Sequence, residues 1–248
     1  MSNYENLADY YDRLMNRDVD YVGWANYLWK LLTELHPNPI EGLELASGTG
    51  NMTEQLIRKN CHLDAFDRSE EMLTIAREKN LPIRDVRFFQ QDMVNFRFAK
   101  KYDFAICSCD SINYLLEDGD LLRVFQRVFD QLKPGGIFLF DVVTLHRMSD
   151  LYGNEIFVVD QEDVYYVWKN QWDPDNRQIS YEITFFVQME DGYERFDEFH
   201  QQRGYTMNEI EMALDKAGFE NNQSFDGFTK NPVTDKSERV QWRAQKGV

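Results

Sequence analysis

Residues 40–51 combine an acid, two glycines and a helix start at a spacing that suits a nucleotide-type ligand. A short apolar run ends at Glu44, small residues form a turn, and a helix is predicted to begin at Asn51. Gly48 and Gly50 permit backbone angles and a close approach that a Cβ atom would prevent. The helix start offers unpaired N–H groups to a ligand, whereas the Glu44 carboxylate repels phosphate. We therefore expect a ligand with a cationic or hydroxyl-rich part, although a plain strand-to-helix corner has the same pattern.

Three further acids, Asp67, Asp92 and Asp110, come at or just after the ends of predicted strands. In an open parallel sheet, ligands bind beyond the carboxyl ends of the strands. Four polar strand ends in succession are much less expected by chance than a single glycine turn. Asp67 follows the turn by about twenty residues, where a carboxylate can bind ribose hydroxyls. Arg68 and Met72 are candidates to flank a purine ring.

The elements that position these acids alternate between strand and helix, which predicts a Rossmann-like, doubly wound and mostly parallel α/β sheet. After the first strand, the sequence predicts strands over 61–67, 85–90, 102–107 and 137–143, and helices over 51–59, 69–80 and 118–132. A capping box at Thr206–Glu209 opens a last helix. Strands over 219–225 and 239–245 then form an antiparallel hairpin at the sheet edge, which gives seven strands.

The residue pattern changes after about residue 150. Alternating apolar residues over 164–172, 179–188 and 193–205, with a hairpin signal at Asp191–Gly192, predict an antiparallel meander of roughly three strands. Two amphipathic helices, over 4–15 and 20–35, precede the first strand. We therefore expect three parts, which are lid helices in 1–36, a core in 37–145 and 206–248, and an inserted substrate cover in 150–205.

Charge and cysteine content limit the partners. The net charge of −16 speaks against nucleic acid, which needs basic patches, and permits a neutral or cationic substrate. The three cysteines form no disulfide framework, and Cys107-Ser-Cys109 lacks the second ligand pair of a zinc site, so we expect no metal. The sequence has no signal peptide and no run of about 18 apolar residues. We expect a cytoplasmic protein without a membrane partner, as a monomer or homodimer.

Five ordered motifs resemble those of the class I S-adenosylmethionine-dependent methyltransferases, of the type that acts on small molecules. The resemblance covers roughly residues 35–145, and its motifs are 44–50, 66–72, 91–93, 102–103 and 132–136. Residues 205–219 also fit, and residues 4–14 resemble the tyrosine-rich N-terminal helix of small-molecule members. Ala46 departs from the glycine that the family often has, but a small residue still permits close approach.

This resemblance implies S-adenosylmethionine as the cofactor and a role for each motif. Glu44 is expected near the sulfonium and amino-acid end, Asp67 at the ribose, and Asp92 with the Met93 N–H at the adenine. The expected cofactor-binding residues are Tyr11, Glu44, Ala46, Ser47, Gly48, Thr49, Gly50, Asp67, Arg68, Met72, Gln91, Asp92, Met93, Ser108, Cys109 and Asp110.

Two rival enzyme classes fit the sequence less well, and one non-enzyme class stays open. The dinucleotide fingerprint of a nicotinamide-dependent oxidoreductase wants a third glycine near position 53, where this chain has Thr53. A base-methylating enzyme is expected to carry an Asn/Asp-Pro-Pro-aromatic loop after the fourth strand, where this chain has Ser108–Asn113. A regulatory protein that binds the cofactor without transferring methyl is the remaining alternative.

The predicted reaction is methyl transfer to N or O of a small-molecule acceptor, an in-line displacement that needs alignment and exclusion of water. A general base is needed only if the acceptor arrives protonated. Glu198 and His200 share one face of the last meander strand, and the unperturbed pKa of histidine suits a base. Tyr11 is the third candidate, because it is expected to close over the methionine part. A structural histidine on a strand is the alternative for His200.

Overall fold

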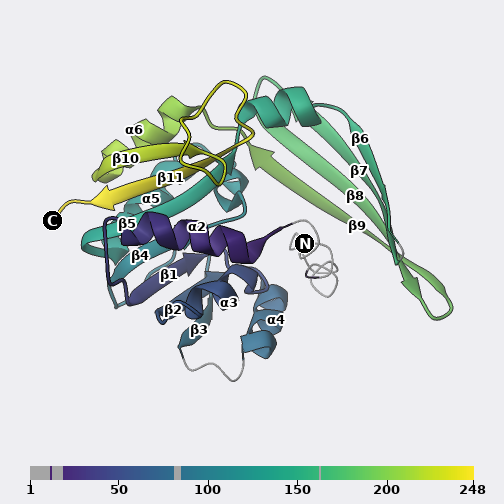
Figure 1. Ribbon diagram of the computed structural model, residues 1–248. Coiled ribbons are helices and arrows are strands. Elements are labelled where there is room, and N and C mark those ends of the chain that lie inside the picture. The colour runs from purple at the N-terminus through teal and green to yellow at the C-terminus, as the bar shows by residue number, and fades with distance from the viewer. Residues whose placement is uncertain (1–11, 13–18, 81–84, 162) are drawn as a thin grey trace.

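The computed structural model describes residues 12, 19–80, 85–161 and 163–248, and these form two sheets flanked by helices (Figure 1). The strands of the first sheet are β1 (Glu41–Leu45), β2 (His62–Asp67), β3 (Val86–Gln90), β4 (Tyr102–Cys107), β5 (Leu132–Val143), β10 (Phe219–Asp226) and β11 (Arg239–Lys246). Their order is β10-β11-β5-β4-β1-β2-β3. β1 to β5 run parallel to one another, whereas β11 is antiparallel to both of its neighbours, β5 and β10, so the predicted fold class and its edge hairpin are confirmed.

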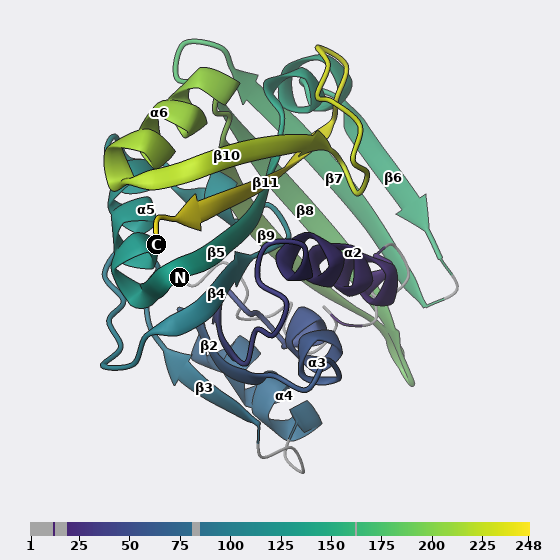
Figure 2. The same cartoon turned by 60° about the vertical axis from the view of Figure 1, so that its left-hand side comes forward.

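Helices cover both faces of this sheet, as Figure 2 shows from a second side. The helices are α2 (Tyr21–Thr33), α3 (Asn51–Ile57), α4 (Glu70–Asn80), α5 (Asp120–Gln131) and α6 (Met207–Ala217). Alternate side chains of β5 pack on opposite faces of the sheet, because successive strand residues point to opposite sides. Ile137 and Leu139 pack in the cluster with α2 and α3, whereas Phe138 and Phe140 pack in the cluster with α5 and α6.

Local sequence signals account for the ends of several helices. The Asp20 side chain accepts the Gly23 N–H at 2.8 Å and caps α2. The capping box between Thr206 and Glu209 is present at the start of α6, as the sequence predicts. The predicted helix over 4–15 lies outside the described residues, except for Asp12.

The second sheet has four strands in the order β6-β7-β8-β9, all antiparallel, and lies to one side of the first (Figure 1). Its strands are β6 (Ile156–Asp160), β7 (Val164–Asp173), β8 (Gln178–Met189) and β9 (Gly192–Arg203). The prediction of roughly three strands missed β6. Both faces of this short edge strand carry apolar residues, with Ile156 and Val158 exposed, so it lacks the period-2 pattern that marks a half-buried strand.

Residues 132–136 also differ from expectation. The helix ends at Gln131 as its Lys-Pro-Gly-Gly sequel predicts, but the following backbone is already extended, and β5 begins at Leu132. Leu132 pairs with Tyr102 of β4, and the register shifts before the regular ladder starts. The glycines therefore form an irregular start of the strand instead of a separate loop.

The described residues carry neither a membrane-spanning helix nor a cluster of metal ligands. Among these residues, no helix is long and apolar enough to cross a membrane. The described part of the chain also holds no group of three or more His, Cys, Asp or Glu side chains placed to bind a metal ion.

Asp103 stabilises the end of the first sheet at which β1 and β4 begin, opposite the carboxyl ends that carry the predicted site. Its Oδ2 accepts the N–H groups of Ile40 and Glu41 at 3.0 and 2.9 Å, and Lys133 Nζ lies 2.7 Å from Oδ1. Burial opposes ionisation, but Lys133 and the two N–H groups outweigh it and hold the pKa of Asp103 below its usual value.

Replacing Asp103 by alanine is expected to lower the free energy of unfolding by about 1–3 kcal/mol, because two partly buried backbone N–H groups lose a charged acceptor. Since the pKa is lowered on folding, this stabilisation is present above the unfolded pKa and lost as pH falls through the folded one. Urea denaturation at pH 7 and pH 3 measures both effects. The control Asp235→Ala, at an exposed position, should stay within about 0.5 kcal/mol of wild type; equal losses in both variants would contradict the role of Asp103.

Candidate active site

A cavity of about 310 Å³ opens where the strand order of the first sheet reverses, between β1 and β4. Ligands of doubly wound sheets bind at this switch point, beyond the carboxyl ends of the strands. The lining residues are Tyr21, Glu44, Ala46, Ser47, Gly48, Thr49, Asn51, Met52, Phe66, Asp67, Arg68, Met72, Gln91, Asp92, Met93, Val94, Ser108, Cys109, Ser111, Tyr114, Leu115, Leu116, Glu117 and Asp120.

The turn after β1 has a left-handed backbone at three positions. Gly48 and Gly50 have φ of 53° and 79°, a conformation that glycine adopts without steric cost. Ala46 has a φ of 51° and lines the cavity, so the glycine that the resemblance leads us to expect is replaced by an L-residue in a strained conformation. The turn is held by the Gly48 N–H, which donates to Asp67 Oδ2 at 2.9 Å.

Glu44 is buried at the end of β1 and borders the cavity. Thr53 Oγ1 donates to its Oε2 at 2.6 Å, so the residue that departs from the dinucleotide fingerprint is a partner of the acid. Burial raises the pKa of Glu44 to about 8, and the Thr53 hydrogen bond opposes this only in part. A cation placed beside Glu44 would favour its ionised form.

Two more acids meet the cavity in different surroundings. Asp67 at the end of β2 accepts the N–H groups of Gly48 and Ser69, each at 2.9 Å. Burial raises the pKa of Asp67 although these donors oppose it. Asp92 is exposed and its Oδ1 accepts the Val94 N–H at 2.8 Å, which fixes the turn after β3.

A polar atom in the cavity wall requires a further partner. Ser47 Oγ is buried, and no described residue offers it a hydrogen bond. A buried hydroxyl is normally satisfied, so this atom suits a polar group of a bound ligand. Together with the buried acid Glu44, the wall therefore fits a ligand that carries both hydrogen-bonding and cationic groups.

The predicted cofactor residues gather around this cavity with three exceptions. Gly50 and Asp110 are not among the lining residues, and the Asp110 carboxylate is bound by Arg239 and Gln202. Tyr11 lies outside the described residues. Its neighbour Asp12 accepts a hydrogen bond from Asn51 Nδ2 at 2.9 Å, beside the turn. The role of each residue stays a prediction.

The two predicted base residues lie on the buried face of β9 in the second sheet, outside the cavity lining. Glu198 and His200 are buried and are not among the lining residues. His200 packs edge-on against Tyr114, which does line the cavity, with ring centroids 6.2 Å apart. Burial lowers the pKa of His200 to about 4, so its imidazole is neutral at pH 7.

Sequence reasoning missed one side of the cavity. This side is formed by Tyr114 at the end of a short 3-10 helix (Ser111–Tyr114), by residues 115–117 of the following segment, and by Asp120, the first residue of α5. Irregular backbone carries no periodic signal, so only the polar end of β4 pointed toward this segment. Tyr21 was predicted as part of an amphipathic helix and lines the cavity from the first turn of α2.

Comparison with known proteins places this geometry in a family. Residues 43–136 match the model of a methyltransferase domain. The chain is 34% identical over 244 residues to YqeM of Bacillus subtilis (strain 168), a protein named as a methyltransferase, with 98% of this chain and 97% of that one covered. The crystal structure of an S-adenosylmethionine-dependent methyltransferase from Clostridium acetobutylicum ATCC 824 is 34% identical, covers 99% of both chains and has a TM-score of 0.90.

The chain belongs to the class I S-adenosylmethionine-dependent methyltransferases. Its cofactor is S-adenosylmethionine, and the unsatisfied Ser47 hydroxyl and the buried acid Glu44 fit that group. A more distant relative of this methyltransferase is the dTDP-3-amino-3,4,6-trideoxy-alpha-D-glucopyranose N,N-dimethyltransferase of Streptomyces venezuelae. It is 30% identical over 135 residues, which cover 54% of this chain and 56% of that one.

Proposed function

We propose that this methyltransferase transfers the methyl group of S-adenosylmethionine to N or O of a small molecule, with an amine as the favoured acceptor. One observation carries the proposal: a single cavity joins the acids at the ends of β1 and β2 to the Tyr114–Asp120 segment. The first side suits the cofactor, and the second leaves room for an acceptor beside it. The Streptomyces venezuelae relative, whose name specifies N-methylation of a dTDP-linked amino sugar, supports a small-molecule acceptor that carries an amine, but not the nucleotide part of that sugar.

The bound cofactor supplies an already activated methyl group, so the protein chiefly binds, orients and excludes water. We assign Asp67 to the ribose hydroxyls, because it reaches the cavity from a rigid strand end. Asp92 and the Met93 N–H are assigned to the adenine edge, and Glu44 to the cationic methionine part. Ser47 Oγ is assigned to a polar group of the same part.

The charge of the lining favours an amine over a phosphorylated acceptor. Among the described lining residues, five are carboxylic acids and Arg68 is the one base. We assign Glu117 and Asp120 to the acceptor, because they line the cavity from the Tyr114–Asp120 segment and not from the strand ends assigned to the cofactor. Carboxylates attract a cation and repel phosphate, so a nucleoside diphosphate sugar would be disfavoured.

Replacing His200 by alanine is expected to lower kcat by no more than about tenfold and to leave the Kd for S-adenosylmethionine unchanged, because His200 supports the Tyr114 ring and does not itself line the cavity. A general base must lie within hydrogen-bond reach of the acceptor, and burial lowers the pKa of His200 to about 4, which also makes it a weak base. The acidic limb of the kcat/KM profile should therefore be the same in wild type and in the variant. A loss of kcat of about 100-fold or more, together with an acidic limb that disappears in His200→Ala, would instead make His200 the base.

Two measurements test the proposed function. Calorimetry with S-adenosylmethionine and S-adenosylhomocysteine tests the cofactor site, and binding must depend on Asp67. Labelled S-adenosylmethionine is then presented with a library of amines, alcohols and phosphorylated sugars. Preferred labelling of amines supports the proposal. Cofactor binding without labelling of any acceptor would favour the regulatory alternative, and binding of NADH would favour the oxidoreductase.

The remaining expectations stay predictions of the sequence. They are the lid role of residues 1–36, the core role of 37–145 and 206–248, and the cover role of 150–205. The same holds for a cytoplasmic location, for a monomer or homodimer, and for the lack of a nucleic acid partner.

A further inference from the structure

The wall of the cavity beside β4 has an unusual backbone. Two consecutive residues, Cys109 and Asp110, have left-handed conformations, with φ of 60° and 49°. Residues other than glycine rarely adopt this conformation, and it persists only where surrounding contacts hold it. Ser108 and Cys109 line the cavity, so the turn at 109–110 shapes this part of the wall. The contacts that fix the position of Asp110 therefore also fix the Ser108–Cys109 part of the cavity wall.

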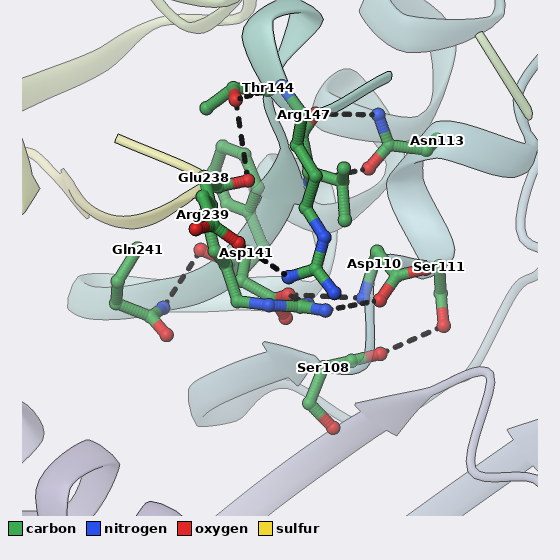
Figure 3. Close-up of polar contacts among 12 residues, drawn as sticks. Ser108, Asp110, Ser111, Asn113, Asp141, Thr144, Arg147, Glu238, Arg239 and Gln241 are labelled. Carbon is green, nitrogen blue, oxygen red and sulfur yellow. Dashed lines mark hydrogen bonds and ion pairs between the residues drawn. The ribbon is translucent and has the colours of Figure 1, made fainter. Parts of the chain in front are cut away.

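Arg239 on β11 is placed to hold that turn. Its Nη2 lies 2.7 Å from Asp110 Oδ1, and its Nη1 pairs with Asp141 Oδ2 on β5. The Asp110 N–H donates to the same Asp141 oxygen at 3.0 Å, so the guanidinium bridges two carboxylates that this N–H also connects (Figure 3). Asp141 is buried, and without Arg239 two acids would lie together with no cation between them.

The same network reaches the second sheet. Gln202 of β9 donates from Nε2 to Asp110 Oδ2 at 2.6 Å and accepts the Tyr181 hydroxyl at 3.0 Å. Tyr181 is the cross-strand partner of His200 in the β8–β9 ladder. The Asp110 carboxylate thus connects the cavity wall to the inner face of the sheet that we propose covers the acceptor.

We propose that Arg239 is a positioning residue for methyl transfer, which through Asp110 fixes the Ser108–Cys109 wall against the methionine part of the cofactor and aligns the second sheet with it. Arg239 is not itself among the lining residues and acts through the turn. This inference rests on the proposed function. Its cofactor half is measured without any acceptor, so the two can fail separately.

The same strand provides a matched control. Arg243 lies four residues further along β11, is buried, and pairs with Glu34 Oε2 at 3.0 Å. Its guanidinium lies over the Phe225 ring at 5.7 Å, much as that of Arg239 lies over Trp24 at 5.6 Å. Arg243 is therefore a comparable structural arginine whose contacts end at α2 and β10, away from the turn at 109–110.

The test compares Arg239→Gln, Arg239→Lys and Arg243→Gln in the full chain. Arg239→Gln is expected to raise the Kd for S-adenosylmethionine about tenfold by calorimetry and to speed alkylation of the Cys109 thiol, followed by peptide mass spectrometry. Arg239→Lys should recover part of both, because it keeps the charge between the acids. Arg243→Gln should lower the melting temperature about as much as Arg239→Gln does. It should leave the Kd for S-adenosylmethionine and the rate of Cys109 alkylation within twofold of wild type.

Two results would overturn the proposal. One is a folded Arg239→Gln protein with wild-type affinity and wild-type Cys109 labelling, and the other is an equal change in Arg243→Gln. If Arg239→Gln does not fold, Asp110→Asn is used instead, since it keeps the side-chain shape and leaves Arg239 with Asp141. A wild-type Kd in Asp110→Asn would equally overturn the proposal. With an identified acceptor, Arg239→Gln should also lower kcat by about tenfold.

Discussion

Replacing Asp67 by asparagine is expected to weaken binding of S-adenosylmethionine by about 100-fold or more. The carboxylate ends β2 inside the cavity, and both of its oxygens are oriented by backbone N–H groups of Gly48 and Ser69. A hydrogen bond to a charged group contributes about 1.5–3 kcal/mol, so losing the charge opposite two ribose hydroxyls amounts to roughly two or more orders of magnitude. Calorimetry with S-adenosylmethionine and S-adenosylhomocysteine measures the loss, which should be equal for both because they share the ribose.

Asp64 provides the matched control for this experiment. It lies on the same strand and is buried, but its carboxylate binds the Arg87 guanidinium, with a Nε–Oδ1 distance of 2.7 Å, and the Tyr102 hydroxyl at 2.7 Å. Asp64→Asn should therefore lower the melting temperature and keep the cofactor affinity within about twofold of wild type. An Asp67→Asn protein that binds as tightly as wild type would exclude Asp67 from the cofactor site.

The sequence predicts those parts of the site whose residues are close together in the chain, at a strand end and in the turn that follows it. Glu44 and its turn, and the strand-end acids Asp67 and Asp92, were predicted because a strand end fixes where its next residues lie. In the sequence, Thr53 indicates only that the third glycine of a dinucleotide fingerprint is missing. In the structure, its hydroxyl donates a hydrogen bond from α3 to Glu44 near the end of β1, and residue spacing alone does not predict this contact.

The parts that the sequence did not predict depend on contacts between distant segments. Asp110 comes three residues after β4 and is expected near the methionine part of the cofactor, a role that stays a prediction. What the sequence does not show is that its carboxylate meets Arg239, which is 129 residues away in the chain. Similarly, the sequence alone does not show whether His200 is a surface residue or a buried one. In the structure it is buried, and Tyr181 of β8, also buried, is its cross-strand neighbour. Periodicity gives the face of a strand but not which face another element covers.

Replacing Glu44 by glutamine is expected to raise the free energy of unfolding of the cofactor-free protein and to lower its affinity for S-adenosylmethionine. Burial raises the pKa of Glu44 from 4.5 to about 8, so the folded state binds a proton more tightly than the unfolded chain. The associated stability is fully present below the unfolded pKa and is lost as pH rises through the folded one. Between about pH 4.5 and 8, wild type should lose up to about 1.4 kcal/mol per pH unit from this group, and Glu44→Gln should lose none of it.

Urea denaturation of both proteins across this pH range measures the effect. The variant should gain on wild type with rising pH, by on the order of a few kcal/mol at pH 8. The control Glu54→Gln removes the same charge from the partly exposed side of α3, where Glu54 pairs with Arg58, and should keep the wild-type slope. Parallel curves for wild type and Glu44→Gln would show that this carboxyl does not titrate as a buried acid.

Cofactor binding should respond to Glu44 in the opposite direction. A cation beside the carboxyl favours its ionised form, so binding by wild type at pH 7 should release a proton, and the affinity should rise with pH up to about 8. Calorimetry in two buffers of different ionisation enthalpy counts that proton. Glu44→Gln should release none and bind S-adenosylmethionine more weakly, by a margin that grows as the pH rises toward 8 and the wild-type carboxyl ionises. The same acid would then destabilise the free fold and bind the cationic cofactor, which is the reason to bury a carboxyl at the end of β1.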